Sequence, residues 1–349
     1  MKICFFGIYD KAYARNRVLM EGLKAHGVEI VEAHVDPQKV KGVAKYFALM
    51  REARASRRQG IDLVIVAFPG HTVVWLAKML FREKLVFDAF LSLYDSNVLD
   101  RKTHKPGSPA ALIDWLLDWS GCALADRVLL DTNAHIDYFV HAFKVKREKC
   151  IRVLIGADDA AFYPQEAALP STFTVHFHGS FIPLQGIEHI LKAAAFLKGE
   201  PVHFRIVGSG QEYDRMVALA GELKVANVEF VGKVPVSSVP GYIAASHVCL
   251  GIFGDTQKTN NVIPNKVYEC VAMGKPVITA DTPAIREIFA DGRDMLLCGA
   301  ANGEALAQTI KRLMNDSSLC KDIAAGGRRT FEEVCTPERI AANLLSQLI

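Results

Sequence analysis

The stretch of sequence with the clearest chemical character is 260–278, where a polar loop leads into a short helix, a Gly-Lys-Pro turn and a buried strand. Lys266 stands at the start of that helix, where free backbone N–H groups and the helix dipole favour an anion. Glu269 follows one turn later on the same helix face and can accept hydrogen bonds from ligand hydroxyl groups. The pair predicts a site for a phosphorylated, hydroxyl-bearing ligand, with a surface Lys–Glu pair as the alternative interpretation.

A second set of candidates follows apolar runs in the first half of the chain, at positions where open parallel sheets bind ligands. Asp95, just after the run Leu85–Leu93, is the preferred group to orient or deprotonate a hydroxyl, and His71, after Asp62–Phe68, is the second choice. The alternatives are that Asp95 caps the following loop and that His71 caps a helix or packs in the core. Candidate ligand contacts near the first strand and the first helix are Tyr9, Asp10, Asn16 and Arg17, with a solvated helix face as the alternative for the last two.

Two weaker signals lie in the second half of the chain. His176 and His178 are two residues apart on one expected strand, so their side chains point to the same face. That spacing can hold a metal ion, but no third ligand is evident, and we predict a structural or ligand-adjacent role and no metal site. Gly208-Ser209-Gly210 alone is a weak dinucleotide-like signal because it lacks the full glycine spacing and a downstream acid.

Alternating strands and helices are predicted to position these residues. Short apolar strands such as Ile3–Phe6 are separated by helices such as Arg17–His26, and the alternation restarts at Thr174–Phe177. Between the two series lies Gly156–Thr172, a break rich in Ala, Pro and acidic residues that contains the predicted linker. Strands this apolar indicate parallel sheets covered on both faces, so we predict an α/β fold of two doubly wound, Rossmann-like domains that face a cleft. The predicted parts are 1–160, the linker 161–172, 173–335, and a C-terminal helix at 336–349 that packs back across the linker.

The composition is that of an ordinary globular protein of 349 residues, with 50% hydrophobic and 23% charged residues, and this length favours two domains. A net charge of +3 is too small to indicate nucleic acid as a partner. The eight cysteines include no CxxC pair, which argues against a zinc site or a disulfide framework and favours a reducing cytosol. No run approaches the ~18 apolar residues of a membrane span, and the first apolar run is too short for a signal peptide.

A series of short segments occurs in a particular order from Val175 to Leu297. The segments are Gly179…Gln185-Gly186-Ile187, Ile206-Val207-Gly208-Ser209-Gly210, Val231-Gly232, Tyr268-Glu269…Met273-Gly274-Lys275-Pro276-Val277-Ile278 and Thr282-Pro283-Ala284-Ile285-Arg286-Glu287. They are preceded by Gly156…Asp159…Phe162-Tyr163-Pro164. Each segment is weak alone, but in this order and spacing the sequence resembles, over most of the chain, the GT-B nucleotide-sugar glycosyltransferases often called family 4.

The resemblance implies a GT-B architecture and a transfer, with retention, of a sugar from a nucleoside diphosphate sugar to an acceptor hydroxyl in cell-surface polysaccharide or glycolipid synthesis. It implies that the C-terminal domain binds the donor and that the N-terminal domain binds a saccharide or lipid-linked saccharide acceptor. Because the leaving group is a diphosphate, catalysis should rest on stabilising phosphate charge and on positioning the acceptor, and the family typically needs no metal or other cofactor. The residues that the resemblance places at the donor are Gly179, Ser180, Gln185, Gly208, Asn261, Lys266 and Glu269.

Three positions depart from the family's usual pattern. Asn261 stands where a first glutamate often lies, and an amide brings no negative charge to the anomeric centre. Ser180 and Gln185 stand where an arginine and a lysine usually bind the diphosphate. Lys266 is the predicted replacement for these cations, with Lys258 as the alternative, helped by backbone N–H groups; Lys258 could also be a solvated loop lysine.

These departures keep two other functions open. One is a sugar nucleotide-binding module without transferase activity, which the missing cations and the missing glutamate would fit. The other is a non-hydrolysing sugar nucleotide epimerase, which can share this fold, although its expected catalytic carboxylates are not recognisable in the sequence.

The segment Lys39–Gln59 is strongly basic, with Glu52 as the one opposing acid, and apolar residues interleave with the cations. It predicts a basic amphipathic helix that is suited to an anionic membrane surface, which would place the protein in the cytoplasm, at the inner face of the membrane. The alternative interpretation is a solvated helix whose apolar side packs on its own domain.

Overall fold

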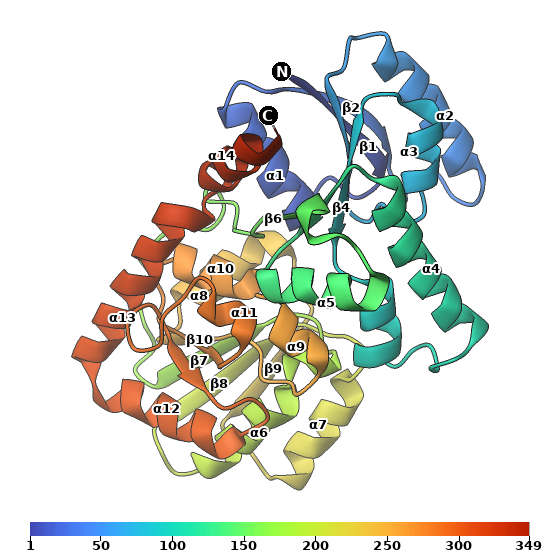
Figure 1. Cartoon of the computed structure of the whole chain (residues 1–349). Coiled ribbons are helices and arrows are strands. Elements are labelled where there is room, and N and C mark those ends of the chain that lie inside the picture. The colour runs from blue at the N-terminus through green and yellow to red at the C-terminus, as the bar shows by residue number, and fades with distance from the viewer. Residues whose placement is uncertain (349) are drawn as a thin grey trace. The chain divides into compact units, whose positions relative to one another are not determined.

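The computed structural model describes residues 1–348, and these divide into two compact units (Figure 1). The first unit comprises Met1–Gly156 together with the C-terminal segment that begins at Thr336, and the second comprises Ala157–Cys335. The compositional break at Gly156–Thr172 overlaps the first of these divisions. Each unit holds one parallel six-stranded sheet with helices interleaved between the strands, so the predicted α/β class is confirmed.

The sheet of the first unit has the strand order β2-β1-β3-β4-β5-β6. Strand β1, which lies between β2 and β3, is buried from Ile3 to Ile8, and Ile3 pairs with Ile30 on one side and Leu63 on the other. Such continuous burial is typical of a parallel strand that is covered on both faces. The strands are β1 (Lys2–Ile8), β2 (Glu29–Val35), β3 (Leu63–Val66), β4 (Lys84–Phe90), β5 (Arg127–Leu130) and β6 (Cys150–Arg152).

Four helices of the first unit share one hydrophobic core with the sheet, and two others, α1 and α14, pack on each other (Figure 1). Gly22 of α1 makes that packing possible, because a Cβ atom there would lie 2.0 Å from the carbonyl oxygen of Pro337. The helices in the shared core are α2 (Ala44–Arg57), α3 (Val74–Leu80), α4 (Pro109–Leu124) and α5 (Asn133–Phe143); the other pair is α1 (Ala14–Ala25) and α14 (Pro337–Leu348).

The basic segment of the sequence forms α2, and most of its apolar side is used inside the first unit. Leu49 and Ala53 are fully buried in the core, and Tyr46 and Met50 are half-buried against it. Phe47 remains 67% exposed beside the cations. The helix therefore has the charge that a membrane contact needs but presents little apolar surface of its own.

The sheet of the second unit has the order β12-β11-β10-β7-β8-β9, with β7 near its middle. The strands are β7 (Phe173–His178), β8 (Val202–Val207), β9 (Val228–Gly232), β10 (Val248–Leu250), β11 (Val277–Ala280) and β12 (Leu296–Cys298). The helices are α6 (Ile187–Phe196), α7 (Tyr213–Glu222), α8 (Val239–Ala244), α9 (Gln257–Asn261), α10 (Asn265–Ala272), α11 (Pro283–Arg286), α12 (Gly303–Asn315) and α13 (Ser317–Thr330). The polar loop predicted before α10 therefore contains a helix of its own, α9.

The chain after β4 differs from the sequence-based prediction. The strand expected at Leu85–Leu93 ends at Phe90, whose positive φ of 57° turns the chain away from the sheet. A π-helix then runs over Asp95–Asp100, where the sequence predicted a loop. Asp118 of α4 holds this turn, since its carboxylate accepts hydrogen bonds from the backbone N–H groups of Leu93 and Tyr94, each at 3.0 Å.

Candidate active site

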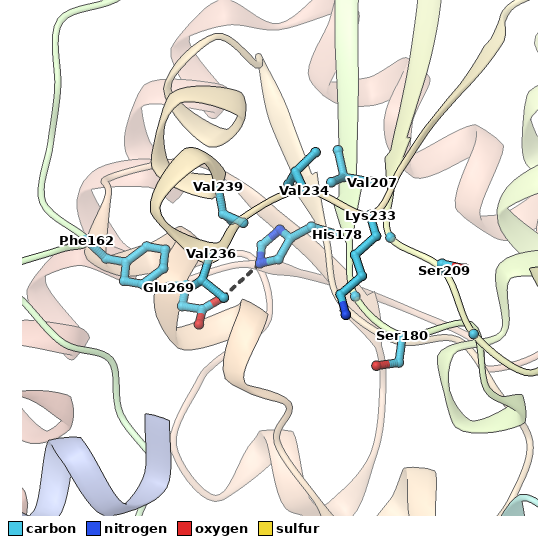
Figure 2. A pocket seen from close by; sticks show the side chains of 13 residues that line it. Phe162, His178, Ser180, Val207, Ser209, Lys233, Val234, Val236, Val239 and Glu269 are labelled. Atoms are coloured by element: carbon cyan, nitrogen blue, oxygen red, sulfur yellow. Dashed lines mark hydrogen bonds and ion pairs between the residues drawn. The ribbon is translucent and has the colours of Figure 1, made fainter. Parts of the chain in front are cut away.

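A cavity of about 470 Å³ lies at the carboxyl ends of β7, β8 and β9 in the second unit (Figure 2). This is the edge at which open parallel sheets bind ligands. Its lining includes four of the predicted donor residues. They are Gly179, Ser180, Gly208 and Glu269.

Glycine is required where β7 and β8 end, because the backbones of the two strand ends lie too close together for a side chain between them. A Cβ atom on Gly208 would lie 1.9 Å from the carbonyl oxygen of Gly179, and the φ of Gly208 is +136°. A Cβ atom on Gly179 would lie 2.7 Å from Nζ of Lys266. Bare backbone therefore forms this part of the wall, so a ligand can approach its peptide groups.

Glu269 of α10 is held in place by a chain of two histidines on β7, and Figure 2 shows the one that contacts it, His178. His178 Nε2 lies 2.8 Å from Oε2 of Glu269, and His178 Nδ1 lies 2.9 Å from His176 Nε2. With an ionised Glu269, His178 donates from Nε2, so its Nδ1 must accept the proton of His176 Nε2 when the ring is neutral. The pair orients the carboxylate that lines the cavity, and His178 itself lines the cavity, so both the structural and the ligand-adjacent role remain predictions.

Lys266 does not line this cavity, contrary to the expectation that it faces the ligand together with Glu269. Its side chain is 4% exposed, its Nζ atom lies 3.6 Å from the centroid of the Phe177 ring, and the ammonium donates to Oε1 of Gln185. Burial lowers the pKa of Lys266 well below its usual value. The amide of Gln185 therefore supplies the polar partner that this buried amine needs, just behind Gly179.

Lys233, directly after β9, is the cation that the sequence analysis missed. Its side chain is exposed, lines the cavity and extends toward Ser180 in Figure 2. Within residues 1–348 its ammonium has no ion-pair or hydrogen-bond partner, whereas its position faces the glycine-rich wall. Because an unpaired cation beside free backbone groups suits an anion, Lys233 is a better candidate for the exposed phosphate contact than Lys266.

Replacing Lys233 by alanine is expected to weaken the binding of a nucleoside diphosphate about tenfold, because one charge-assisted contact is lost. Affinity for the nucleoside, which carries no phosphate, should be unchanged. Calorimetric titration with both ligands measures this, and Lys321→Ala on α13 is the matched control for a lost surface charge. If Lys233→Ala binds the diphosphate as tightly as the unchanged protein while Lys266→Ala does not, the buried lysine is the phosphate ligand.

Several of the other side chains that line the cavity are apolar. They include Val234, Val236 and Val239 near the start of α8 and Phe162 from the segment that opens the second unit, and Figure 2 shows the Glu269 carboxylate between Phe162 and Val236. A cavity lined by both charged and apolar side chains fits a ligand that joins a ring system to phosphates. Asn261, at the end of α9, is buried and does not line the cavity.

The first unit has a cavity of its own, of about 400 Å³, at the carboxyl ends of β1 and β3. Three of the residues predicted there, Tyr9, Asp10 and His71, line it. Tyr9 is otherwise buried, with its hydroxyl 3.3 Å from Glu32 and its pKa raised by burial. Asp10 is exposed, and its carboxylate accepts from the N–H of Ala12 at 2.8 Å.

The structure favours His71 over Asp95 as the group that would orient or deprotonate a ligand hydroxyl, the reverse of the order predicted from the sequence. Asp95 is completely buried at the start of the π-helix and does not line the cavity, so its side chain is not placed to reach a ligand there. His71 lines the cavity with its Nε2 3.0 Å from the carbonyl oxygen of Leu91 and 3.4 Å from Oδ1 of Asp118. Its Nδ1 has no protein partner in the described chain, and burial lowers the pKa of the ring. His71 is thus an oriented imidazole whose buried Nδ1 has no protein partner, and it replaces Asp95 as the preferred candidate for a general base.

The two remaining predicted contacts lie on α1 and do not line the first unit's cavity. Asn16 is buried, and its side-chain N–H donates to the carbonyl oxygen of Phe68 at 2.6 Å. Asn16 therefore supports the turn that carries His71, a role that its position in the sequence does not reveal. Arg17 is half-buried on the same helix.

Two further features are absent from residues 1–348. No group of three or more His, Cys, Asp and Glu side chains is arranged to hold a metal ion. No described helix combines the length and the apolar character that crossing a bilayer requires.

Comparison with solved structures identifies the class to which this fold belongs. The chain aligns over its full length with sucrose-phosphate synthase from Thermosynechococcus elongatus, at a TM-score of 0.75, 17% identity and 98% coverage of that chain. It aligns equally fully with HepE of Anabaena in complex with UDP-glucose, at a TM-score of 0.73, 16% identity and 99% coverage. The protein has the fold of the GT-B glycosyltransferases.

Comparison of the sequence identifies the second unit more closely. Residues 172–316 match the family model described as glycosyl transferases group 1. A lipopolysaccharide core biosynthesis glycosyltransferase of Rhizobium meliloti, LpsE, is 26% identical over 44% of this chain and 43% of its own length. An MMP alpha-(1->4)-mannosyltransferase of Mycolicibacterium hassiacum is 23% identical over 58% of this chain and 49% of its own. The chain spans less than half the length of these curated relatives.

Proposed function

We propose that this protein transfers a sugar from a nucleoside diphosphate sugar to a hydroxyl of a saccharide or lipid-linked saccharide, with retention at the anomeric carbon. The donor binds in the cavity of the second unit, and the acceptor binds in the cavity of the first. The product belongs to a cell-surface polysaccharide or a glycolipid, as the lipopolysaccharide relatives suggest. The reaction needs no metal or other cofactor, because cationic side chains and backbone N–H groups meet the charge of the diphosphate.

The observation that carries this proposal is the cavity of the group 1 glycosyltransferase domain. Glu269 supplies a fixed carboxylate for the ribose hydroxyl groups, and Lys233 supplies an unpaired cation at the glycine-rich wall. The apolar side chains of Val236 and its neighbours accommodate the base. The solved complexes of HepE hold UDP and UDP-glucose, so uridine diphosphate sugars are the first donors to test.

The test is to incubate the protein with UDP- and GDP-sugars, with and without a panel of saccharide acceptors, and to measure nucleoside diphosphate release. Release that depends on an acceptor supports transfer, and the anomeric coupling constant of the product reports retention or inversion. Interconversion of the sugar nucleotides would instead identify an epimerase. Binding without turnover would identify a binding module, which the presence of Ser180, Gln185 and Asn261 keeps as the second candidate.

Replacing Glu269 by glutamine is expected to weaken nucleoside and nucleoside diphosphate binding alike, by about fivefold. The amide keeps the shape and can still accept from His178, but hydrogen bonds to a charged acceptor are roughly twice as strong as those to a neutral one. The two titrations used for Lys233 measure the effect. A loss confined to the diphosphate would mean that Glu269 acts on the phosphates through the neighbouring cations and does not contact the ribose.

We further propose that the protein works in the cytoplasm at the inner face of the membrane, with Lys39–Arg58 as an electrostatic contact. The cations of this segment support this proposal, since Lys39 before α2 and Arg51 on α2 keep at least four fifths of their side-chain surface exposed. Attraction of this kind is screened by salt. The buried apolar side of α2 leaves open which part of the molecule enters the lipid.

A further inference from the structure

Exposed apolar side chains gather on two adjacent helices of the first unit. Six of the sixteen large apolar residues that are exposed in the described chain lie on α3 and α4, which pack against each other (Figure 1). Their exposed fractions run from 41% to 70%. We call this set the α3–α4 apolar patch, and it consists of Trp75, Met79, Leu112, Ile113, Leu116 and Trp119.

The spacing of these residues places them on the outer sides of the helices. Trp75 and Met79 are four residues apart on α3, opposite Leu76 and Ala77, which are buried. On α4, Leu112, Leu116 and Trp119 recur at intervals of four and three residues, whereas Ala111, Asp114, Asp118 and Cys122 are buried. Both helices bury their inner sides in the same core, and they pack against each other. Their outer sides therefore lie next to each other on the surface of the first unit.

Cations surround one end of this patch. Lys78 of α3 and Trp119 of α4 line a common hollow with Lys144, Lys146 and Lys149. Arg127 is the fifth cation of the hollow, against two acids, Asp126 and Glu148. Lys149 is anchored, since its Nζ lies 3.1 Å from the carbonyl oxygen of Cys122 at the end of α4. The excess of positive charge beside exposed tryptophan and leucine side chains is complementary to anionic headgroups above an acyl layer.

We infer that the α3–α4 apolar patch enters the surface of an anionic bilayer, with the surrounding lysines on the headgroups. Tryptophan suits this depth because its ring is apolar and its N–H is polar, and the N–H of Trp75 already donates to the carbonyl oxygen of Thr72. This inference extends the peripheral contact proposed above by naming the inserting surface. It holds whether or not the chain transfers sugar, since it rests on the first unit alone.

The three tryptophans of the protein, Trp75, Trp115 and Trp119, all lie on α3 and α4, so intrinsic fluorescence reads this surface directly. With vesicles of phosphatidylcholine and phosphatidylglycerol, the emission should shift to shorter wavelength, and brominated lipid should quench it. Vesicles of phosphatidylcholine alone should bind at least tenfold more weakly at low salt. Unchanged emission and no quenching with either vesicle would overturn the inference.

Charged substitutions test whether the α3–α4 apolar patch or α2 is responsible for membrane binding. Met79→Glu together with Leu116→Glu should lower partitioning into the anionic vesicles at least tenfold, because two apolar side chains lose their place in the lipid. Phe196→Glu, on an aromatic residue that is 60% exposed on α6 of the second unit, is the matched control and should bind like the unchanged protein. If charge reversal on α2 abolishes binding while the patch variant binds normally, α2 is the membrane contact and the inference is wrong.

Analytical sedimentation of the protein without lipid tests whether a second copy of the chain covers the α3–α4 apolar patch. A monomer is expected. A dimer that the Met79→Glu, Leu116→Glu variant dissociates would show that a second copy of the chain covers the patch, and it would overturn insertion. Nucleoside diphosphate affinity, measured on the same variant, should be unchanged, so a failure of this inference is distinguishable from a failure of the proposed transferase.

Discussion

Replacing His71 by glutamine should lower the rate of sugar transfer by about 10²–10⁴-fold, the usual contribution of a general base. Glutamine can place its amide N–H near the position of Nε2 and keep the hydrogen bond to Leu91, which the structure shows at 3.0 Å. It cannot supply the second ring nitrogen, Nδ1, which is buried beside the cavity of the first unit and has no protein partner among the described residues. The substitution therefore removes the base and keeps most of the packing.

The control for this variant is the binding of nucleoside diphosphate to the second unit, which should match that of the unchanged protein. Asp95→Asn is the second comparison, since Asp95 is buried and does not line the cavity. If Asp95→Asn abolishes transfer in a folded protein while His71→Gln leaves the rate unchanged, the order of preference derived from the sequence was the right one.

The pH dependence of sugar transfer is an independent test of the proposed role of His71 as a base. Burial lowers the pKa of His71, so the ring is neutral at pH 7 and gains a proton only when the pH falls below the ordinary pKa of a histidine. A base must be unprotonated, so the rate should hold through neutral pH and fall only on the acid side. This acid limb should be absent from the residual activity of His71→Gln.

His71 and Asp95 also show where prediction from the sequence reached its limit. Both follow apolar runs, and the rule that ligands bind at strand ends applied to both. The rule failed for Asp95 because the strand ends three residues early, at Phe90, and the chain then winds into a π-helix that buries the carboxylate. No local signal in the sequence marks the positive φ of a phenylalanine, since the conformation is imposed by tertiary packing.

The cavity of the second unit was predicted in outline, but the cation that lines it was not. The glycines at the ends of β7 and β8 and the carboxylate on α10 were found, because glycine and a charged residue each leave a strong local signal. Lys266 was assigned by its place at a helix start, but that turn is covered by Gly179 and Gln185. Lys233 directly follows β9, so the strand-end rule used for the first unit would have found it in the second.

The fold itself was predictable because most of its strands are short, continuous apolar runs between periodic helices. β6 and β12, with three residues each, carry too little pattern to be recognised alone. The C-terminal helix was predicted to pack back on the earlier part of the chain, but nothing local identifies Gly22 as its contact. Long-range packing of this kind becomes visible only when both helices are placed.

Replacing Arg15 by alanine should lower the free energy of unfolding of the first unit by about 3–5 kcal/mol, the cost of breaking a buried ion pair. Both side chains of the pair with Asp88 are 1% exposed, and Nη2 of Arg15 lies 2.8 Å from Oδ1 of Asp88. The guanidinium also donates to the carbonyl oxygens of Val153 and Leu154, at 2.6 and 3.0 Å. Alanine would thus leave a buried carboxylate and two carbonyl groups without their donor.

Unfolding of this unit can be followed separately, because Trp75, Trp115 and Trp119 all belong to it. Urea titration monitored by their fluorescence should show the midpoint shifted down, while nucleoside diphosphate binding at the second unit persists in the absence of urea. Lys24→Ala on the same helix is the control, since its ion pair with Glu21 is solvent-exposed and contributes less than about 1 kcal/mol.

The double variant Arg15→Met, Asp88→Leu tests which part of the loss is electrostatic. Replacing both charges by apolar groups removes the unpaired carboxylate, so most of the stability lost in Arg15→Ala should return. About 1–3 kcal/mol should remain missing, because the carbonyl groups of Val153 and Leu154 still lack a donor. A double variant no more stable than Arg15→Ala would mean that Arg15 acts through those two carbonyl groups, by tying the chain after β6 to α1, and that its ion pair with Asp88 contributes little.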